Sequence, residues 1–499
     1  MGFKALLLKP FANKIARDID RWSADAVGAQ RKVFQQLLAK GQHTRFGRDH
    51  KLISDMPYEA FREQVPVRDY EALKPYVERI KQGEKDVLWP GLPRYFAKTS
   101  GTTSGVKYIP LTKDSMPNHF GSARNALFNY YARTGNGRFL DGKMIFLSGS
   151  PELEEVGGIA TGRLSGIVNH EVPGWLRTNQ LPSYQTNCIE EWEEKLERVI
   201  DETLNADMRL ISGIPPWVQM YYERLLERTG KKTVKAVFPN YSMFVYGGVN
   251  FEPYRAALEN LVGERLDSVE TYPASEGFIA FQDTQTEPGL LLNAYSGIFF
   301  EFIPLDEIHN DHPRRLWLNE VEIGVNYVLI INNNAGLWGY NIGDTVQFVS
   351  KDPYRLVVSG RVKHFISAFG EHVIGKEVEE AMNAAAARHS VRVVEYTVAP
   401  QVSPPEGGTP YHEWFVEFQE PPQDLQQFAA DLDREMVQQN IYYQDLIGGN
   451  ILQPLKVQVM QRDAFRSYMK TQGKLGGQNK VPRLSNDRKV ADLLKDLRQ

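Results

Sequence analysis

From Lys98 onward, short apolar or β-branched runs alternate with polar, amphipathic segments, and this alternation constrains the fold more than any other feature. Lys143–Leu147 (KMIFL) has the composition of a buried strand, and Met208–Ile211 has that of the next strand. Between them, Cys188–Leu204 has the pattern of a charged amphipathic helix. Strands that alternate with helices are typical of a sheet covered by helices. The pattern therefore predicts an α/β domain.

The flanking regions have other patterns. Apolar residues recur at near-helical spacing through about the first 65 residues, which predicts helices there. Leu266–Glu270 is a further strand candidate, and a β-meander is expected after it. The expected strands of this meander are Ile298–Ile303, Glu320–Ile323, Tyr327–Asn332, Val346–Val349 and Leu356–Val358.

Near Ser359 the pattern changes to that of a smaller α+β domain. Helices are expected at Lys376–His389 and Leu425–Asn440. Strands are expected at Val391–Ala399, Glu413–Phe418 and Lys456–Met460. This order has β-α-β-β-α-β character over about 140 residues, the size of an ordinary domain. We therefore expect two domains, residues 1–358 and residues 359–499.

Charge and hydropathy bear on which partners are expected. The 499 residues include 58 Lys+Arg and 62 Asp+Glu, which gives a formal net charge of -4. This near-neutral balance offers no electrostatic reason to expect nucleic-acid binding. The longest apolar stretches, such as Tyr327–Ile331, are far shorter than the roughly 20 residues of a membrane span, so no membrane partner is expected.

The cysteine content points to a compartment. Cys188 is the single cysteine, so the chain has no internal disulfide, as is usual in a reducing environment. The N-terminal apolar run Ala5–Leu8 is shorter than the roughly seven residues that a secretory signal requires. Together these features predict a cytoplasmic protein.

Seven consecutive residues of the chain are glycine, serine or threonine, and a lysine follows closely. Such a segment presents backbone N–H groups and small hydroxyls, which suit phosphate oxygens. It is not a Walker A loop, because only three residues separate Gly101 from Gly105. The composition favours phosphate binding over a flexible linker. The expected binding residues are Thr99, Ser100, Gly101, Thr102, Thr103, Ser104, Gly105 and Lys107.

Two further segments place carboxylates beside turns. Glu276 lies in Glu270–Gly277, which follows an expected strand, where open α/β sheets bind ligands. Its carboxylate can hold Mg²⁺ beside a triphosphate, although the segment taken alone favours an ordinary strand-to-turn connection. Asp344 follows Gly343, so it can accept hydrogen bonds from ribose hydroxyls or simply form a hairpin turn.

Basic residues follow near the expected domain boundary and near the C-terminus. Arg361 lies at the boundary, where a cation can contact a ligand bound between domains or remain on the surface. The Gly- and Lys-rich segment Gly473–Arg483 contains Lys474 and Lys480. A lysine on such a segment can neutralise charge that develops on phosphate, although a solvated loop is the common alternative.

These segments, in this order, resemble the adenylate-forming superfamily of acyl-CoA synthetases, luciferases and peptide-synthetase adenylation domains. Within it, the chain most resembles the Gretchen Hagen auxin-responsive family of acyl-acid amido synthetases. The similarity runs from about residue 45 to about residue 485, and Gly360-Arg361 and Gly370-Glu371 are closer to the general superfamily pattern. The segments that resemble family motifs are Thr99–Lys107, Tyr272–Gly277, Gly297–Pro304, Ala335–Asp344 and Asn479–Arg483.

The resemblance implies a fold and an activity. The fold is a large N-terminal adenylate-forming domain of β-sheets with flanking helices, followed by a small α+β C-terminal lid. The activity is adenylation of a carboxylic acid with ATP and Mg²⁺, followed by acyl transfer to an amine, expected to be an amino acid.

The resemblance also implies residue roles. Glu276 holds Mg²⁺, Asp344 grips the ribose with help from Arg361, and Lys480 is the adenylation lysine, with Lys474 as the reserve. The remaining residues expected at ATP are Tyr272, Ala274 and Ser275.

Two other functions remain open at this point. An acyl-CoA ligase uses the same first half-reaction, and a non-catalytic relative binds the nucleotide without turnover. The sequence identifies neither the acid nor the amine. Trp175, Met220 and Tyr246 are candidates for the acyl pocket, and each fits a core position equally well.

Overall fold

The computed structural model of the chain describes residues 2–102, 105–172, 177–248, 251–308, 310–362, 365–371, 373–472 and 481–498. The chain forms two compact units. The large unit comprises Met1–Thr99, Lys107–Ile189 and Lys195–Val362, and the small unit comprises Ser100–Val106, Glu190–Glu194 and Lys363–Gln499. That residues 1–358 and 359–499 are separate domains stays a prediction.

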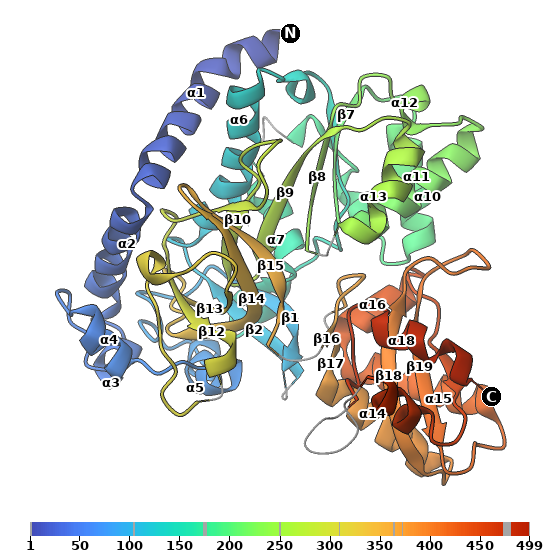
Figure 1. Cartoon of the computed structure of the whole chain (residues 1–499). Helices are drawn as coiled ribbons and strands as arrows, with labels where there is room; N and C mark the ends of the chain where they lie inside the picture. The colour runs from blue at the N-terminus through green and yellow to red at the C-terminus, as the bar shows by residue number, and fades with distance from the viewer. Residues whose placement is uncertain are drawn as a thin grey trace. The chain divides into compact units, whose positions relative to one another are not determined.

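The large unit begins with helices, as the apolar spacing predicts. They are α1 (Phe3–Ala24), α2 (Ala26–Gly41), α3 (Arg45–Asp49), α4 (Tyr58–Gln64) and α5 (Tyr70–Lys81). Asp25 caps α2 because its carboxylate accepts a hydrogen bond from the Gly28 N–H at 2.9 Å. A buried stripe of α1, which includes Ile15 and Ile19, packs against α6 (Ser122–Thr134). Figure 1 shows α1 and α6 side by side.

Most strands of the large unit belong to one mixed sheet. In the described residues its order is β12-β13-β14-β15-β11-β10-β9-β8-β7-β3-β6. Strands β6, β3, β7, β8 and β9 pair in parallel, and pairing from β9 to β12 is antiparallel. The strands are β3 (Lys143–Phe146), β6 (Gln180–Leu181), β7 (Met208–Ser212), β8 (Met243–Gly247), β9 (Asp267–Ala274), β10 (Gly277–Phe281), β11 (Leu290–Leu292), β12 (Ile298–Pro304), β13 (Asn326–Asn333), β14 (Tyr340–Lys351) and β15 (Tyr354–Arg361).

Helices lie between the parallel strands in the sequence and pack beside them, as expected for α/β folding (Figure 1). They are α7 (Leu164–Glu171), α9 (Tyr184–Asn187), α10 (Trp192–Thr203), α11 (Pro215–Thr229), α12 (Val234–Val237) and α13 (Glu252–Val262). The C-cap of α11 is Gly230 with a φ of 64°, a left-handed conformation that glycine adopts without strain. The mixed architecture confirms the predicted α/β class.

One expected strand of the meander is absent. The segment 320–323 follows a short 3₁₀ turn, Leu318–Glu320, and is not among the named strands of the described chain. Strand β13 already pairs with β12 on one side and β14 on the other. No position next to β13 is therefore left for a further strand.

A second sheet of the chain has the order β2-β1-β5-β4. Its strands are β1 (Tyr95–Thr102), β2 (Gly105–Leu111), β4 (Glu154–Val156) and β5 (Ile159–Gly162). The Ser/Thr/Gly segment therefore lies largely within strands, where the sequence predicted a loop. Residues Thr99–Thr102 extend β1 and Gly105 begins β2, because backbone pairing continues beyond the apolar residues. Thr103 and Ser104 lie outside the described residues.

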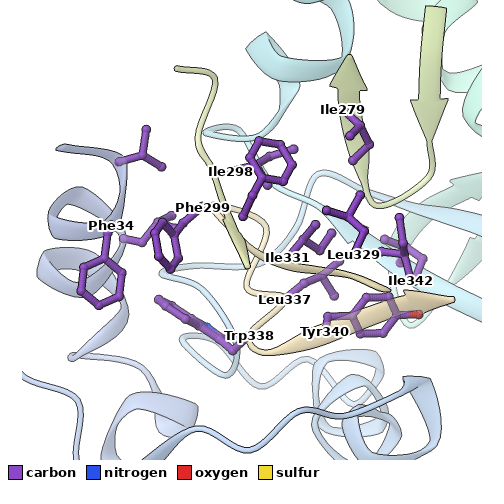
Figure 2. Packing of buried hydrophobic residues seen from close by; sticks show 14 of the residues in the cluster. Phe34, Ile279, Ile298, Phe299, Leu329, Ile331, Leu337, Trp338, Tyr340 and Ile342 are labelled. Atoms are coloured by element: carbon purple, nitrogen blue, oxygen red, sulfur yellow. The ribbon is translucent and has the colours of Figure 1, made fainter. Parts of the chain in front are cut away.

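The core of the large unit lies where the N-terminal helices meet the antiparallel half of the sheet. Figure 2 shows Phe34 of α2 beside Phe299 of β12, with Trp338 and Tyr340 nearby. Trp338 is fully buried, and its indole N–H donates to the Leu88 carbonyl at 3.2 Å. Burial of such a side chain contributes about 1.5–3 kcal/mol. Trp338 also stacks on Phe46 of α3 with ring centroids 5.9 Å apart, which attaches the segment Ala335–Asp344 to the N-terminal helices.

The small unit is α+β, as predicted. Its main sheet has the order β18-β19-β20, from β18 (Val393–Gln401), β19 (Tyr411–Phe418) and β20 (Lys456–Val459), with β16 (Phe365–Ile366) and β17 (Val373–Ile374) as a separate pair. Its helices are α14 (Gly375–Arg388), α15 (Leu425–Gln439), α16 (Ile441–Gly448), α17 (Ala464–Thr471) and α18 (Lys489–Leu494). Across the described parts of both units, no helix has the length and apolar character needed to cross a membrane.

Candidate active site

The carboxyl ends of four parallel strands meet at one edge of the main sheet. Strands β3, β7, β8 and β9 are adjacent and run in the same direction, so their C-terminal ends lie side by side. Small residues lie at or just beyond these ends, at Ser148–Ser150, Gly213 and Gly247. Open α/β sheets bind ligands at such an edge, and the predicted Glu276 lies directly beyond the last of these strands.

Strand β9 is longer than predicted, and this changes the position of the predicted residues. It continues to Ala274, which pairs with Gly277 of β10 across a turn made of Ser275 and Glu276. The sequence suggested that the strand ends at Glu270. The extension arises because Thr271 and its successors pair with β10, so Tyr272 lies within the strand rather than after it.

The structure brings Tyr272 and Asp344 into direct contact. The Tyr272 hydroxyl donates to Asp344 Oδ2 at 2.5 Å, and Asp344 is 7% exposed. Strands β9 and β14 lie four positions apart in the sheet, which corresponds to about 19 Å in a flat sheet. The contact therefore requires the sheet to curl. Asp344 lies inside β14, so it belongs neither to the hairpin turn nor to the position before a strand that the sequence suggested.

Glu276 is linked to the same strand, β14. Its Oε1 accepts a hydrogen bond from the Tyr340 hydroxyl at 3.4 Å, and its side chain is 9% exposed. Burial raises the pKa of Tyr340 well above its usual value, and the negative charge of Glu276 raises it further. Within the described part of the chain, no basic side chain forms an ion pair with Glu276. A nearly buried carboxylate of this kind suits a cation from a ligand.

Three residues that sequence reasoning missed hold this arrangement. Tyr340 lies four residues before Asp344 on β14, and both side chains are buried there, on either side of an irregularity in the pairing with β13. Asn333 donates from Nδ2 to the Glu276 carbonyl at 2.7 Å. Asn118 accepts from the Phe278 N–H at 2.7 Å. The run Asn332–Asn334 was the available signal, because three successive amides at the end of a buried strand need partners.

Arg361 is placed near Asp344 by backbone register alone. The two residues are directly opposite in the antiparallel pair β14–β15. Directly opposed residues have Cβ atoms about 4.5–5.5 Å apart. The backbone of Arg361 therefore lies beside that of Asp344, and the role of Arg361 stays a prediction.

Glu301, the carboxylate of the motif-like segment Gly297–Pro304, has a structural role. Glu301 is fully buried and forms an ion pair with Arg315, with Nη2 to Oε2 at 2.7 Å. Tyr58 donates to its Oε1 at 2.8 Å and Asn332 donates to its Oε2 at 2.8 Å. Because its oxygens are occupied by these protein groups, Glu301 is part of the scaffold.

The residues predicted to bind phosphate lie mainly on β1 and β2. Lys107 on β2 is half-buried and has contacts within the chain. The backbone of Thr99, Ser100, Gly101, Thr102 and Gly105 is described in β1 and β2. Lys474 and Lys480, together with Trp175, lie outside the described residues.

The two remaining acyl-pocket candidates lie on separate elements. Tyr246 of β8 is buried and stacks on Phe251 with ring centroids 4.2 Å apart. Met220 is half-buried on α11. In the described ranges, no group of three or more His, Cys, Asp or Glu side chains could hold a metal ion. A metal at Glu276 would therefore need ligands other than a cluster of such side chains.

Three family models match the chain. The GH3 family N-terminal domain matches residues 15–177, the GH3 family central domain matches residues 291–361, and the GH3 family C-terminal domain matches residues 376–489. The central match contains Asp344 and Arg361. The matches together extend over most of the chain.

Curated relatives and solved structures agree with these matches. The chain is 22% identical to the jasmonoyl–L-amino acid synthetase JAR6 of Nicotiana attenuata, over 94% of this chain and 93% of the relative. It is 23% identical to the indole-3-acetic acid-amido synthetase GH3.3 of Arabidopsis thaliana, over 96% and 93%. The solved AtGH3.15 acyl acid amido synthetase in complex with 2,4-DB has a TM-score of 0.62 at 15% identity, with 98% of this chain and 96% of that chain covered. This last similarity supports the fold.

Proposed function

The chain belongs to the GH3 family, and from this premise we propose that it is an ATP-dependent acyl-acid amido synthetase. It adenylates a carboxylic acid and transfers the acyl group to an amine, for which an amino acid is the favoured class. The observation that best supports this proposal is the meeting of Tyr272, Asp344, Glu276 and Tyr340 at the ligand-binding edge of the sheet. The amido synthetase names of relatives that match nearly the whole chain agree with it.

The reaction has two steps. An oxygen of the acid carboxylate attacks the α-phosphorus of ATP, and pyrophosphate leaves with the electrons of the broken P–O bond. The amine nitrogen then attacks the acyl carbonyl carbon and loses a proton, and AMP leaves with the electrons of the C–O bond. In both steps the protein mainly positions the reactants and stabilises charge.

Asp344 is proposed to bind the ribose hydroxyls. A carboxylate accepts several hydrogen bonds, so the bond from Tyr272 orients Asp344 without excluding a ligand. Arg361, directly opposite on β15, is proposed to assist at this end of the nucleotide. Ala274 and Ser275 form the end of β9 and the start of the turn, where their backbone can approach the nucleotide closely.

Glu276 is proposed as the protein ligand of Mg²⁺. Its burial, together with the absence of a basic partner among the described residues, fits a cation that ATP brings to the site. Mg²⁺ commonly takes one or two carboxylates and completes its shell with phosphate oxygens and water. When bound, the ion offsets the negative charge of the phosphates. Tyr340 donates to Glu276 and so helps to fix its orientation.

The phosphate contacts are proposed for the Ser/Thr/Gly segment and the basic residues. Thr99–Gly105 and Lys107 would bind the departing pyrophosphate. Lys480 is the first choice for the lysine that stabilises the adenylation transition state, and Lys474 is the reserve. We propose that the reaction takes place in the cytoplasm, because Cys188 is the single cysteine of the chain and no internal disulfide can form.

The direct test is hydroxylamine trapping across a panel of carboxylic acids with ATP and Mg²⁺. We expect hydroxamate and pyrophosphate with at least one acid, and loss of most of this activity in Asp344→Asn. Asp55→Asn is the control, because Asp55 is an exposed aspartate of the same unit. ATP binding without hydroxamate or pyrophosphate across a broad panel would refute the proposal. Product analysis with amino acids and with CoA then identifies the acceptor.

A further inference from the structure

A buried lysine without a carboxylate partner lies at the carboxyl end of β3. Lys195 is 3% exposed, and its Nζ donates to the Ser148 carbonyl and to the Asn187 carbonyl, each at 2.8 Å. No carboxylate in the described residues contributes to the electrostatics of this amine. Two carbonyls use two of its three N–H donors.

The position of Lys195 on α10 explains its burial. Leu196, Val199 and Ile200 are buried on the same helix and form its core-facing stripe, which Lys195 joins at the N-terminal end. An ammonium group in such a place loses its hydration, and two neutral carbonyls compensate only in part. Burial lowers the pKa of Lys195 to about 8. At neutral pH the amine is still mainly charged.

The neighbouring Asn187 has an unsatisfied side chain. It is fully buried, and neither Nδ2 nor Oδ1 has a hydrogen-bond partner among the described groups. Buried amides almost always have partners, so such a residue indicates water, an ion or a ligand. The backbone carbonyl of Asn187 accepts a hydrogen bond from Lys195 Nζ. The unsatisfied amide and the buried ammonium group therefore belong to adjacent parts of the structure.

A second cation lies against the same segment of chain. A Cβ atom built on Gly149 would lie 3.5 Å from Arg163 Cδ and 3.6 Å from Arg163 Nη1, so the Arg163 side chain covers the residue after Ser148. The charge of Arg163 lowers the pKa of Lys195 further, while Cys188 acts in the opposite direction. Lys195 and Arg163 thus place two positive charges beside the segment Ser148–Ser150. Lys195 has no carboxylate partner among the described residues.

We propose that Lys195, Asn187 and Arg163 form a buried subsite for a small carboxylate. The ammonium and the amide Nδ2 supply donors for its oxygens, and the cations supply the charge that it neutralises. The subsite lies at the edge of the sheet that carries the candidate active site, three strand positions from β9, or about 14 Å. The occupant is either a free small carboxylate or, if the proposed function holds, the second carboxylate of a dicarboxylic acid substrate.

Thermal unfolding with sodium formate tests the subsite directly. Formate is titrated at constant ionic strength, with a bulky sulfonate as the replacing anion. We expect a saturable rise of about 2 °C or more in the unfolding midpoint of the wild type. Lys195→Met and Asn187→Leu should lose the rise. Lys351→Met should keep it, because Lys351 also donates to two carbonyls but is exposed.

The outcomes separate the subsite from the proposed function. Absence of a saturable formate effect on the wild type overturns the subsite, whether or not the variants fold. A rise that persists in both Lys195→Met and Asn187→Leu also overturns it.

ATP–pyrophosphate exchange with chain-matched monocarboxylic and dicarboxylic acids, from hexanoate and adipate to dodecanoate and dodecanedioate, distinguishes the two sources. The subsite is assigned to the substrate if the wild type prefers the dicarboxylate at least tenfold and Lys195→Met abolishes this preference. Formate stabilisation without such a preference assigns it to a free carboxylate. Absence of exchange with every acid tested would count against the proposed function and leave the formate result standing.

Discussion

At the residue scale, hydroxyl–carboxylate pairs hold the candidate site together. Tyr272 contacts Asp344, and Tyr340 contacts Glu276, so each predicted carboxylate is oriented by a tyrosine from another part of the sheet. Such pairs fix a side-chain rotamer before any ligand binds, which lowers the entropy that binding must overcome.

Removal of the Tyr272 hydroxyl should weaken ATP binding. A hydrogen bond to a charged group contributes about 1.5–3 kcal/mol, so Tyr272→Phe should raise the KM for ATP at least severalfold. The measurement is steady-state pyrophosphate release at varied ATP. Tyr130→Phe is the matched control, because the Tyr130 hydroxyl donates to Asp267 at 2.5 Å at the other end of β9. An equal rise in KM for both variants would contradict the role of Tyr272.

The buried Lys195 predicts a specific dependence of stability on pH. Its pKa is about 8 in the folded chain and about 10.4 when unfolded, so between these values the unfolded chain binds more protons. The free energy of unfolding should therefore rise with pH from about 8 to about 10.4, by at most about 3 kcal/mol, relative to Lys195→Met. Chemical denaturation across this range, without added carboxylates, measures the difference. A constant difference between the two proteins would show that the amine is not desolvated.

At the element scale, the sequence predicted the class of each region better than the ends of its strands. The alternation after Lys98 predicted the α/β class, and most strand centres lie where apolar runs occur. The polar residues Thr99, Tyr272 and Asp344 were assigned to loops or turns, but all three lie in strands. Their strand conformation depends on pairing with other strands, as that of Tyr272 does on Ala280 of β10, and local composition does not reveal such pairing.

The same limitation explains which parts of the candidate site were missed. Asp344 and Glu276 were identified from turn-like motifs, but Tyr340 and Asn333 became apparent only once the curled sheet brought distant segments together. Lys195 was overlooked because a lysine in a charged amphipathic helix is normally exposed. Only the three-dimensional packing of α10 shows that it lies on the buried stripe.

The stability of the chain should depend on the side-chain amide of Asn333 at the end of β13. Asn333 accepts from the Ala335 and Leu337 N–H groups, each at 3.0 Å, and donates to the Glu276 carbonyl. Asn333→Ala leaves three buried groups unpaired, so we expect a loss of about 2–4 kcal/mol in the free energy of unfolding. Urea denaturation measures it. Asn334→Ala should cost less, because Asn334 donates to one carbonyl from a partly exposed position. Equal losses would contradict this assignment.

At the scale of the whole molecule, the chain forms two compact units, and the predicted adenylation lysines, Lys474 and Lys480, follow helix α17 of the small unit in the sequence. The proposed reaction has two chemically different steps, and the proposed role of Lys480, stabilising charge on phosphate, belongs to the first step alone.

Lys480→Ala should therefore affect the half-reactions unequally. Adenylation develops extra negative charge on phosphate, which a lysine stabilises, whereas attack by the amine on the acyl carbonyl does not. We expect pyrophosphate release to fall by at least a hundredfold, while amide formation from preformed acyl-adenylate stays within a fewfold of wild type. Rapid-quench assays of each half-reaction measure both rates. Lys474→Ala is the comparison, and equal loss in both steps would exclude the proposed role of Lys480.

The mixed pairing of the main sheet has a consequence for how the chain reaches this structure. Strands β12 to β15 are neighbours in sequence as well as in space, so they can pair early by closing short loops. The pairing of Leu290 with Leu356 joins β11 to β15 only after the whole meander has formed between them. The Tyr272–Asp344 contact, which links β9 with β14 of the meander, is thus expected to form late. A folding intermediate that holds the meander alone would expose the unpaired edge of β15, which makes this edge the place where self-association during synthesis is expected.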